Sequence, residues 1–265
     1  MSAAAPIPPE VSRVGELGDL AEDLAAASLA LARRFAAGAT MWCVSPTWPH
    51  HARHVAVEFV HPVIVGKRAL PAIMLPADDL VATLRVSVRP GDVVVALADA
   101  AEPAVADAMR RAQAWGVETL WIGVGPRPPS GAADHVLWLA GDEALAAYNG
   151  RFILLYHLLW ELTHVCFEHP GLLKPEADCE GEVCITCSDE GRLGEVMAVR
   201  DDLEAVVRTP SGPETIDTAL VGPLHDGDLV LIHAGSAISR LGSDPGAAGG
   251  RMFTFGNGGS ATDAA

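Results

Sequence analysis

Hydrophobic and polar residues follow two different periods along the first 168 residues. From Glu10 to Ala36 apolar residues recur at helical spacing, and Gly38 follows as a stop signal, so this segment is predicted to be one long amphipathic helix. Beyond it, short β-branched or aromatic runs alternate with stretches of helical period. The predicted strands are Thr40 to Val44, Leu70 to Leu75, Asp92 to Ala98, Thr119 to Val124 and His135 to Leu139, and the predicted helices are Pro49 to His61, Pro103 to Trp115 and Asp142 to Phe167.

This alternation predicts the fold class of the first part of the chain. Strands that alternate with helices form βαβ units, in which a parallel sheet is covered by helices on both faces. The helix from Asp142 to Phe167 is apolar nearly all round, as buried helices are. Residues 1–168 are therefore predicted to form one three-layer α/β domain.

A different pattern follows residue 168. Residues 169–182 contain two prolines and several acidic residues, which is typical of an exposed linker. In residues 183–241 short alternating or apolar runs are separated by glycine, proline and aspartate, which predicts a small antiparallel β-barrel of the OB type. These runs are Glu195 to Val199, Glu204 to Arg208, Glu214 to Leu220 and Leu229 to Ala234. The tail, residues 242–265, is rich in glycine and alanine and is predicted to be disordered.

Composition and charge narrow the classes of function. The 265 residues, half of them apolar, suffice for two domains. Thirty-four acidic residues against 18 basic ones give a net charge of −16, which repels nucleic acid and anionic lipid. No apolar run approaches the roughly 20 residues that a membrane-spanning helix needs. Glu10 and Glu16 lie where a secretory signal would be basic and then apolar, so we expect a cytoplasmic protein.

The segment Met41 to Leu75, MWCVSPTWPHHARHVAVEFVHPVIVGKRALPAIML, resembles the sugar-isomerase (SIS) fold, in particular its phosphoheptose isomerase branch. The resemblance covers roughly residues 10 to 168. It implies a strand, a glycine-rich loop and a helix whose backbone N–H groups hold a sugar phosphate. Here the loop, Ser45 to Pro49, contains two prolines and Trp48, and the second phosphate element, Ala98 to Pro103, contains two acids. Both phosphate cradles are therefore predicted to be lost.

Three residues of this region could share a divalent metal ion. His54 and Glu58 are four residues apart on one predicted helix, and His157 lies on the last one. The resemblance implies that these positions bind metal and move protons, and a glutamine of the family's set falls near Asn149. The alternative interpretation is a polar outer helix face, or a buried histidine bonded to a carboxylate.

Residues Cys184 to Leu241 resemble the HypC/HupF family of hydrogenase maturation chaperones. The resemblance rests on Cys184-Ile-Thr-Cys187-Ser-Asp and on the closing stretch ETIDTALVGPLHDGDLVLIHAGSAISRL. It implies a carrier that takes an Fe(CN)2CO unit from a HypD-like scaffold protein to the large-subunit precursor of nickel-iron hydrogenase. The implied ligands are a cysteine, Cys187 or Cys184, and His233. The family's cysteine follows the initiator methionine and precedes Pro-Gly, whereas both cysteines here are internal, and Cys187 is slightly favoured.

A zinc site is the alternative interpretation of the same cysteines. Cys179, Cys184 and Cys187 are close enough in sequence to bind one zinc ion together with a histidine. That site would make the region a zinc-binding interaction module.

The last residues, Phe255 to Ala265, resemble the glycine-rich SIS phosphate loop. Gly256, Gly258 and Gly259 would let backbone N–H groups approach an anion, and Ser260 would add a hydroxyl. No helix follows to support such a loop. We expect that the parent gene continues into a second SIS domain; the alternative is a coincidental glycine-rich tail.

The sequence thus predicts a non-catalytic assembly factor. In this interpretation a degenerate SIS domain, self-associating through its helices, is fused to a HypC-like metal-transfer barrel. The rival prediction is a sugar-phosphate isomerase of the sedoheptulose 7-phosphate type with an accessory barrel, acting through His54, Glu58 and His157.

Overall fold

The computed structural model describes residues 15–140, 150–174, 191–200 and 203–241. The chain divides into two compact units, Met1–Asp178 and Cys179–Ala265. Each unit is described by itself below. The predicted tail, residues 242–265, lies outside the described residues.

The first unit contains the predicted parallel sheet. Its strands run in the order β2-β1-β3-β4-β5, and every neighbouring pair is parallel. The central strand β3 is buried along its whole length, as expected for a sheet covered on both faces. The strands are β1 (Met41–Val44), β2 (Ala72–Met74), β3 (Val93–Leu97), β4 (Glu118–Val124) and β5 (His135–Leu139).

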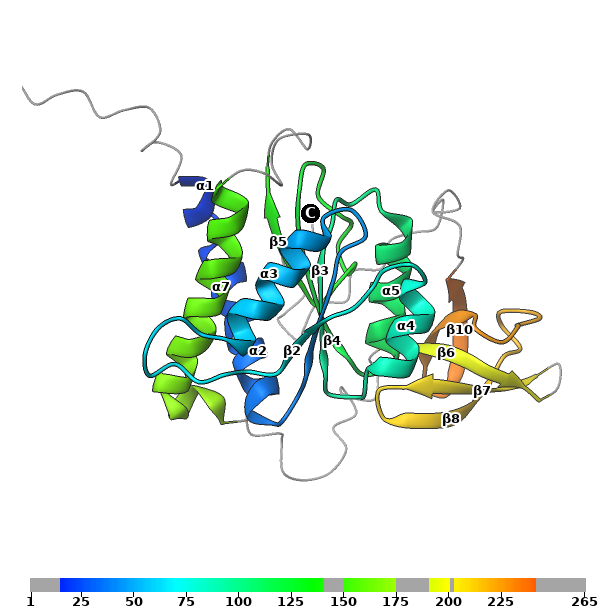
Figure 1. Ribbon diagram of the computed structural model, residues 1–265. Helices are drawn as coiled ribbons and strands as arrows, with labels where there is room; N and C mark the ends of the chain where they lie inside the picture. The colour runs from blue at the N-terminus through cyan, green and yellow to red at the C-terminus, as the bar shows by residue number, and fades with distance from the viewer. Residues whose placement is uncertain (1–14, 141–149, 175–190, 201–202, 242–265) are drawn as a thin grey trace, which may run out of the picture. The chain divides into compact units, whose positions relative to one another are not determined.

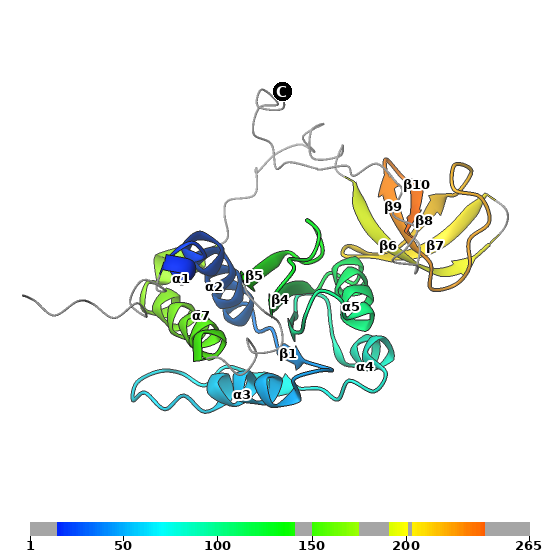
Figure 2. The ribbon, with the colours of Figure 1, turned by 90° about the horizontal axis from the view of Figure 1, so that it is seen from above.

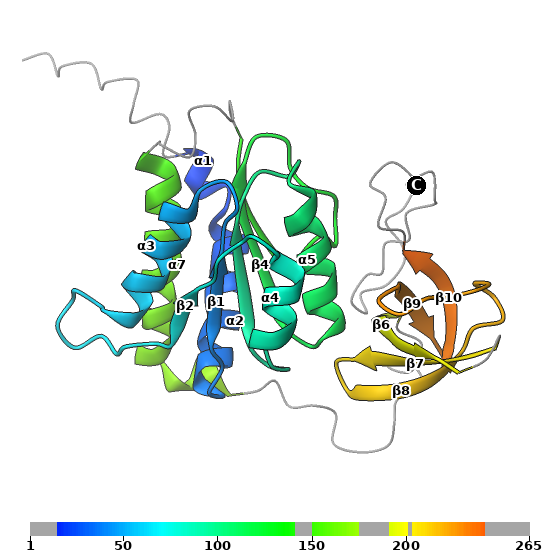
Figure 3. The same ribbon diagram turned by 45° about the vertical axis from the view of Figure 1, so that its right-hand side comes forward.

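Helices cover the two faces of this sheet and make three layers (Figures 1 and 3). On one face lie α2 (Ala21–Ala36), α3 (Pro49–Val60) and α7 (Gly150–Glu168). On the other face lie α4 (Leu80–Ser87) and α5 (Pro103–Ala114). The three-layer α/β class is therefore confirmed.

The first helical segment is broken, where the sequence pattern predicts one continuous helix. A single turn, α1 (Gly15–Gly18), is separated from α2 by a turn at Asp19 and Leu20. Glycine costs about 1 kcal/mol relative to alanine inside a helix, and Gly18 stands where the helix stops. Residues 10–14 of the predicted helix lie outside the described residues.

Helix α4 has no counterpart among the predicted elements. Asp79 caps it, because the Asp79 side chain accepts a hydrogen bond from the backbone N–H of Ala82 at 3.1 Å. The helix has only two turns and buries Leu80 and Leu84. The apolar pattern of these eight residues is too short to be distinguished from that of a strand.

Helix α7 packs against α2 and α3, and this packing buries one face of α7. Its buried face includes Phe152, Tyr156 and Leu159. The prediction that this helix is buried all round is wrong, because Leu154 is exposed and His157 is half-buried. The half-buried position of His157, beside the buried Tyr156, matters for the site described below.

The second unit is a closed five-stranded barrel (Figure 2). Its strands follow the order β10-β8-β7-β6-β9. All neighbouring pairs are antiparallel except β10 with β8, which pair in parallel at Ser236 and Asp217. The small barrel is thus confirmed, with one parallel pairing that the sequence pattern does not predict. The strands are β6 (Arg192–Val199), β7 (Glu204–Thr209), β8 (Gly212–Asp217), β9 (Leu229–His233) and β10 (Ser236–Leu241).

The barrel interior is filled mostly by alanine and β-branched side chains. The buried cluster consists of Val196, Ala205, Val207, Ile216, Leu224, Val230, Ile232 and Ala237. Gly194 on β6 makes room for the Ile232 side chain. The barrel is therefore a packed core of its own.

Among the residues that the structure describes, no helix has both the length and the apolar character needed to cross a membrane.

Gly123 on β4 offers a test of the sheet packing. A methyl group at this position would overlap the indole ring of Trp138 and the carbonyl oxygen of Ala98, and the ring is held by a hydrogen bond from Trp138 Nε1 to the carbonyl of Gly125. We expect Gly123→Ala to lower the free energy of unfolding by about 1–3 kcal/mol in urea titrations. The control is Gly171→Ala, where the added methyl group meets nothing within 4 Å; equal effects of the two variants would contradict this packing.

Candidate metal centre

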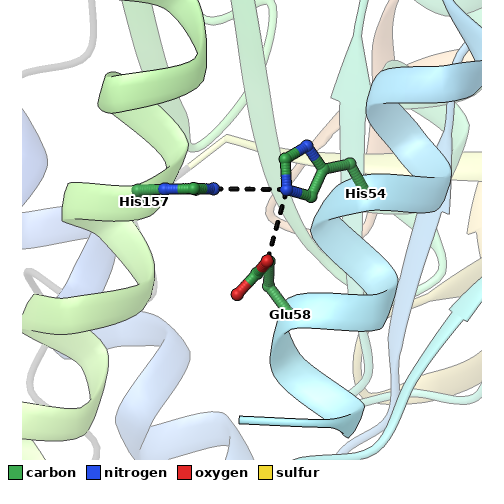
Figure 4. A group of neighbouring side chains, drawn as sticks. All are labelled: His54, Glu58 and His157. Carbon is green, nitrogen blue, oxygen red and sulfur yellow. Dashed lines mark hydrogen bonds and ion pairs between the residues drawn. The ribbon is translucent and has the colours of Figure 1, made fainter. Parts of the chain in front are cut away.

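His54, Glu58 and His157 come from two helices that pack side by side. Pro49 begins α3, where a residue without N–H is tolerated, and the helix then places His54 and Glu58 one turn apart on the same face. His157 approaches them from α7. Figure 4 shows the three side chains pointing toward one another, so the structure brings together the residues that the sequence predicts to share a metal.

The spacing of the three groups suits a metal ion. Nε2 of His54 lies 3.2 Å from Oε1 of Glu58 and 3.3 Å from Nε2 of His157. One ligand atom from each of the three residues lies within 4.8 Å of the others. Ligands bound at about 2.0–2.1 Å in a tetrahedron stand roughly 3.4 Å apart. The two distances from Nε2 of His54 are close to that edge.

Two buried residues that the sequence analysis does not include among the site residues stand behind His54. The hydroxyl of Tyr156 lies 2.9 Å from Nδ1 of His54 and 3.2 Å from Nδ1 of His51. Burial, and secondly the negative charge of Glu58, raise the pKa of Tyr156 to about 12. Tyr156 is therefore a neutral hydroxyl at physiological pH, able both to donate and to accept a hydrogen bond.

A further bond holds α7 against α3 beside the three ligands. Nε1 of Trp160 donates to the backbone carbonyl of Glu58 at 2.8 Å. Since Trp160 lies one turn beyond Tyr156 and His157, this bond also fixes where both of those residues meet α3.

In the loop that follows β1, two side chains are buried against the rest of the α/β unit. In an open sheet of this order, ligands bind where the connections after neighbouring strands diverge to opposite faces. Here the connections after β1 and β3 do so, and the hydroxyl of Ser45 donates to the carbonyl of Leu97 and accepts from the N–H of Trp48. The Trp48 side chain is only 7% exposed and meets Phe152 edge to face at 5.5 Å. Trp48 and Ser45 are thus buried and bonded at the end of β1, on the side where such a crevice would open.

The loop that follows β3 is closed in a similar way. Oδ1 of Asp99 accepts the N–H of Ala101 at 2.9 Å, so that this donor is bonded within the loop. Pro103 then begins α5 without an N–H of its own. In the two loops the backbone N–H groups of Trp48 and Ala101 are therefore bonded within the protein.

The predicted ligands of the second unit are only partly within the described residues. Cys179, Cys184 and Cys187 lie outside them, as does the glycine-rich stretch that contains Gly256, Gly258, Gly259 and Ser260. The described free cysteines, Cys43 and Cys166, are buried. Burial raises the pKa of both thiols, so these two cysteines are poor metal ligands.

His233 is the last residue of β9 and is followed by a two-residue turn into β10. Ala234 and Gly235 have φ angles of 48° and 81°, and Ser236 pairs with His233 across the turn. A positive φ is costly for alanine, so this turn carries backbone strain next to the histidine. The residue lies on the penultimate strand, where the sequence predicts the final one, because Ser236–Leu241 forms a strand of its own.

No family model matches the chain, and no curated protein matches it. Among solved structures, a phosphoheptose isomerase from Francisella tularensis is 14% identical and has a TM-score of 0.48; the match covers 58% of this chain and 91% of that one. A phosphoheptose isomerase from Neisseria gonorrhoeae is 17% identical with a TM-score of 0.46, over 57% and 90% of the two chains. The C-terminal domain of glucosamine-fructose-6-phosphate aminotransferase from Francisella tularensis is 14% identical with a TM-score of 0.41, over 58% and 41%.

Sheet order and helix layers, rather than these likenesses, establish the fold class of the first unit.

Proposed function

We propose that the α/β unit binds one divalent transition-metal ion through His54, Glu58 and His157. The observation that carries this proposal is the convergence of two imidazole nitrogens and one carboxylate oxygen within 4.8 Å. Two nitrogens and one oxygen suit zinc, cobalt or iron(II) rather than magnesium or calcium, which prefer oxygen ligands. Three protein ligands are also the number found in metal sites that bind an exchangeable ligand.

A metal at this position would act as a Lewis acid toward a ligand oxygen. The chain's own residues would orient that oxygen, and the carboxylate of Glu58 is placed to accept or return a proton. No built cradle accompanies these groups, because Trp48 and Ser45 fill the crevice beside β1. Without a positioned phosphate, an isomerase loses the orientation that makes its chemistry fast.

For the whole chain we propose a role in the maturation of nickel-iron hydrogenase. The residue pattern of Cys184 to Leu241 supports it, and a closed barrel with a histidine beside a strained turn is compatible with it. In this proposal a thiolate of Cys187 or Cys184 and the imidazole of His233 hold the Fe(CN)2CO unit as cargo, since soft sulfur ligands suit low-spin iron.

The proposed partners are a HypD-like scaffold protein and the hydrogenase large-subunit precursor. The barrel carries an apolar surface of the kind that partners cover: Leu203 and Leu220 are 58% and 71% exposed. A hollow of about 310 Å³ is lined by Leu203, Ala219, Pro223 and Leu224 among others. Self-association through the helices of the α/β unit is also proposed, and Val57 and Leu154 offer exposed apolar side chains for it.

The second candidate function is isomerisation of a sugar phosphate. It is favoured by one observation, the pairing of a carboxylate and two imidazoles around a single point. It requires a way of holding the substrate other than the two closed loops.

Metal binding can be tested with cobalt(II). In protein whose Cys179, Cys184 and Cys187 are replaced by serine, so that the thiols of the second unit do not compete for cobalt, we expect the chelator-stripped form to bind one equivalent. Its visible spectrum should be that of cobalt with nitrogen and oxygen ligands. The same serine background is used in the cobalt experiments below. His54→Ala and His157→Ala should each weaken this binding on the order of 100-fold or more, measured by competition with a chromophoric chelator. The control is His61→Ala, an exposed histidine at the end of the same helix. Wild-type affinity in the His54 and His157 variants would refute the proposed ligands.

The maturation role can be tested in cells that depend on this chain to mature a nickel-iron hydrogenase. We expect Cys187→Ala or Cys184→Ala, introduced one at a time, to abolish hydrogenase activity in one of the two cases, because the iron unit loses its thiolate. His233→Ala should lower the activity, whereas His225→Ala, whose side chain is 75% exposed, should leave it unchanged. Full activity in both cysteine variants would rule out the carrier role.

The isomerase candidate has a direct test. We expect no turnover of sedoheptulose 7-phosphate by the zinc- or cobalt-loaded protein when products are followed by mass spectrometry, because the phosphate has no cradle. Turnover that disappears in Glu58→Gln would establish the second candidate and overturn our interpretation of the loops.

A further inference from the structure

Hydrogen bonds run inward from the proposed metal ligands through two residues that no ligand assignment uses. Nδ1 of His54 meets the hydroxyl of Tyr156 at 2.9 Å, and the same hydroxyl meets Nδ1 of His51 at 3.2 Å. Tyr156 and His51 are only 1% and 3% exposed. The hydroxyl therefore interacts with two imidazoles in a setting that bulk water does not reach.

The direction of these bonds follows from the ligand atom of His54. Nε2 of His54 faces Glu58 and His157, so this is the nitrogen that a metal would use. The proton of the neutral ring must then reside on Nδ1, which donates to the oxygen of Tyr156. The hydroxyl proton of Tyr156 is left free to be donated to Nδ1 of His51. With a metal on Nε2 of His54, this arrangement of protons gives the hydroxyl of Tyr156 one bond from Nδ1 of His54 and one bond to Nδ1 of His51.

The Tyr156 ring is held so that its hydroxyl has little freedom to move. It makes edge-to-face contacts with His54 at 5.3 Å, with His157 at 5.3 Å and with Phe152 at 6.0 Å between ring centroids. Such contacts restrict the ring as well as the neighbouring imidazoles. Two of the proposed metal ligands are therefore packed against the side chain that bonds to one of them.

We propose that Tyr156 is a positioning residue of the metal centre and that His51 acts through it. When its own proton is donated to Nδ1 of His51, the Tyr156 hydroxyl can only accept from Nδ1 of His54, which leaves Nε2 for the metal and fixes the rotation of that ring. This inference rests on the proposed metal site of the α/β unit. It adds to that site a buried support that determines how strongly the metal is held.

The first test is Tyr156→Phe, which keeps the ring and removes the hydroxyl. Groups that orient a ligand histidine typically contribute 10–100-fold to metal affinity. We expect cobalt(II) binding to weaken by about that factor and the visible cobalt spectrum to change, because His54 loses its fixed orientation. The matched control is Thr163→Val on the same helix, which removes a buried hydroxyl bonded to the carbonyl of Leu159. This control should keep wild-type affinity and spectrum.

The second test asks whether His51 acts through Tyr156. His51→Phe retains an aromatic ring, and alone it should weaken cobalt binding by less than Tyr156→Phe does. Combined with Tyr156→Phe it should cause no further loss, since the hydroxyl that His51 directs is already gone. Melting temperatures of the metal-free variants show that each protein is folded and separate a loss of affinity from a loss of structure.

The outcomes separate this inference from the proposed function. If wild-type protein binds cobalt and Tyr156→Phe binds it with unchanged affinity and spectrum, the positioning role is overturned while the metal site stands. If the effects of the two variants add, His51 does not act through Tyr156, and that half of the inference is overturned. If protein with Cys179, Cys184 and Cys187 replaced by serine takes up no cobalt, the metal site and the positioning role are both overturned.

Discussion

The hydroxyl of Tyr156 crosses the boundary between α7 and α3 and lies 2.9 Å from the imidazole of His54. The proposed centre depends on this contact because its ligands come from two separate helices. His54 and Glu58 are one turn apart and meet by helix geometry alone. His157 reaches them only if α7 has the correct rotation about its own axis and the correct position along α3. The bond from Trp160 to the carbonyl of Glu58 and the buried face around Phe152 set both.

The end of β1, which leads into the helix of the proposed metal ligands His54 and Glu58, does not offer an open site for a phosphate. A crevice forms where the connections after β1 and β3 diverge, but the hydroxyl of Ser45 bridges the two strand ends and the Trp48 indole fills the space. A buried indole packed on Phe152 contributes on the order of 2–3 kcal/mol to the core. Vacating the crevice for a ligand would forfeit that stabilisation. The loop therefore contributes to stability in the place where an open loop would bind an anion.

Local patterns predict the parts of this molecule that local geometry decides. The parallel sheet follows from alternating strands and helices, and the i and i+4 spacing of His54 and Glu58 predicts their shared face. The joining of His157 to them depends on tertiary packing, and in the sequence it rests on a family resemblance. Tyr156 gives no separate signal, because a tyrosine in an apolar helix is usually a core residue. The signal that could have identified it is its position, immediately before the proposed ligand His157 and on the buried face.

The two donor sets that the sequence offers differ in chemistry, and this difference limits how the chain could use them. Two imidazoles and one carboxylate, as in the α/β unit, suit borderline divalent ions. A thiolate with His233 would be softer and would suit low-spin iron with cyanide and carbonyl ligands. A metal ion that binds well to the imidazole and carboxylate set would bind less well to the thiolate set, and the reverse holds for low-spin iron. Transfer of one metal between the two sets would therefore be unfavourable. If both proposals hold, the centre on α3 and α7 would therefore be a resident site, and the proposed iron unit would be carried by the second unit alone.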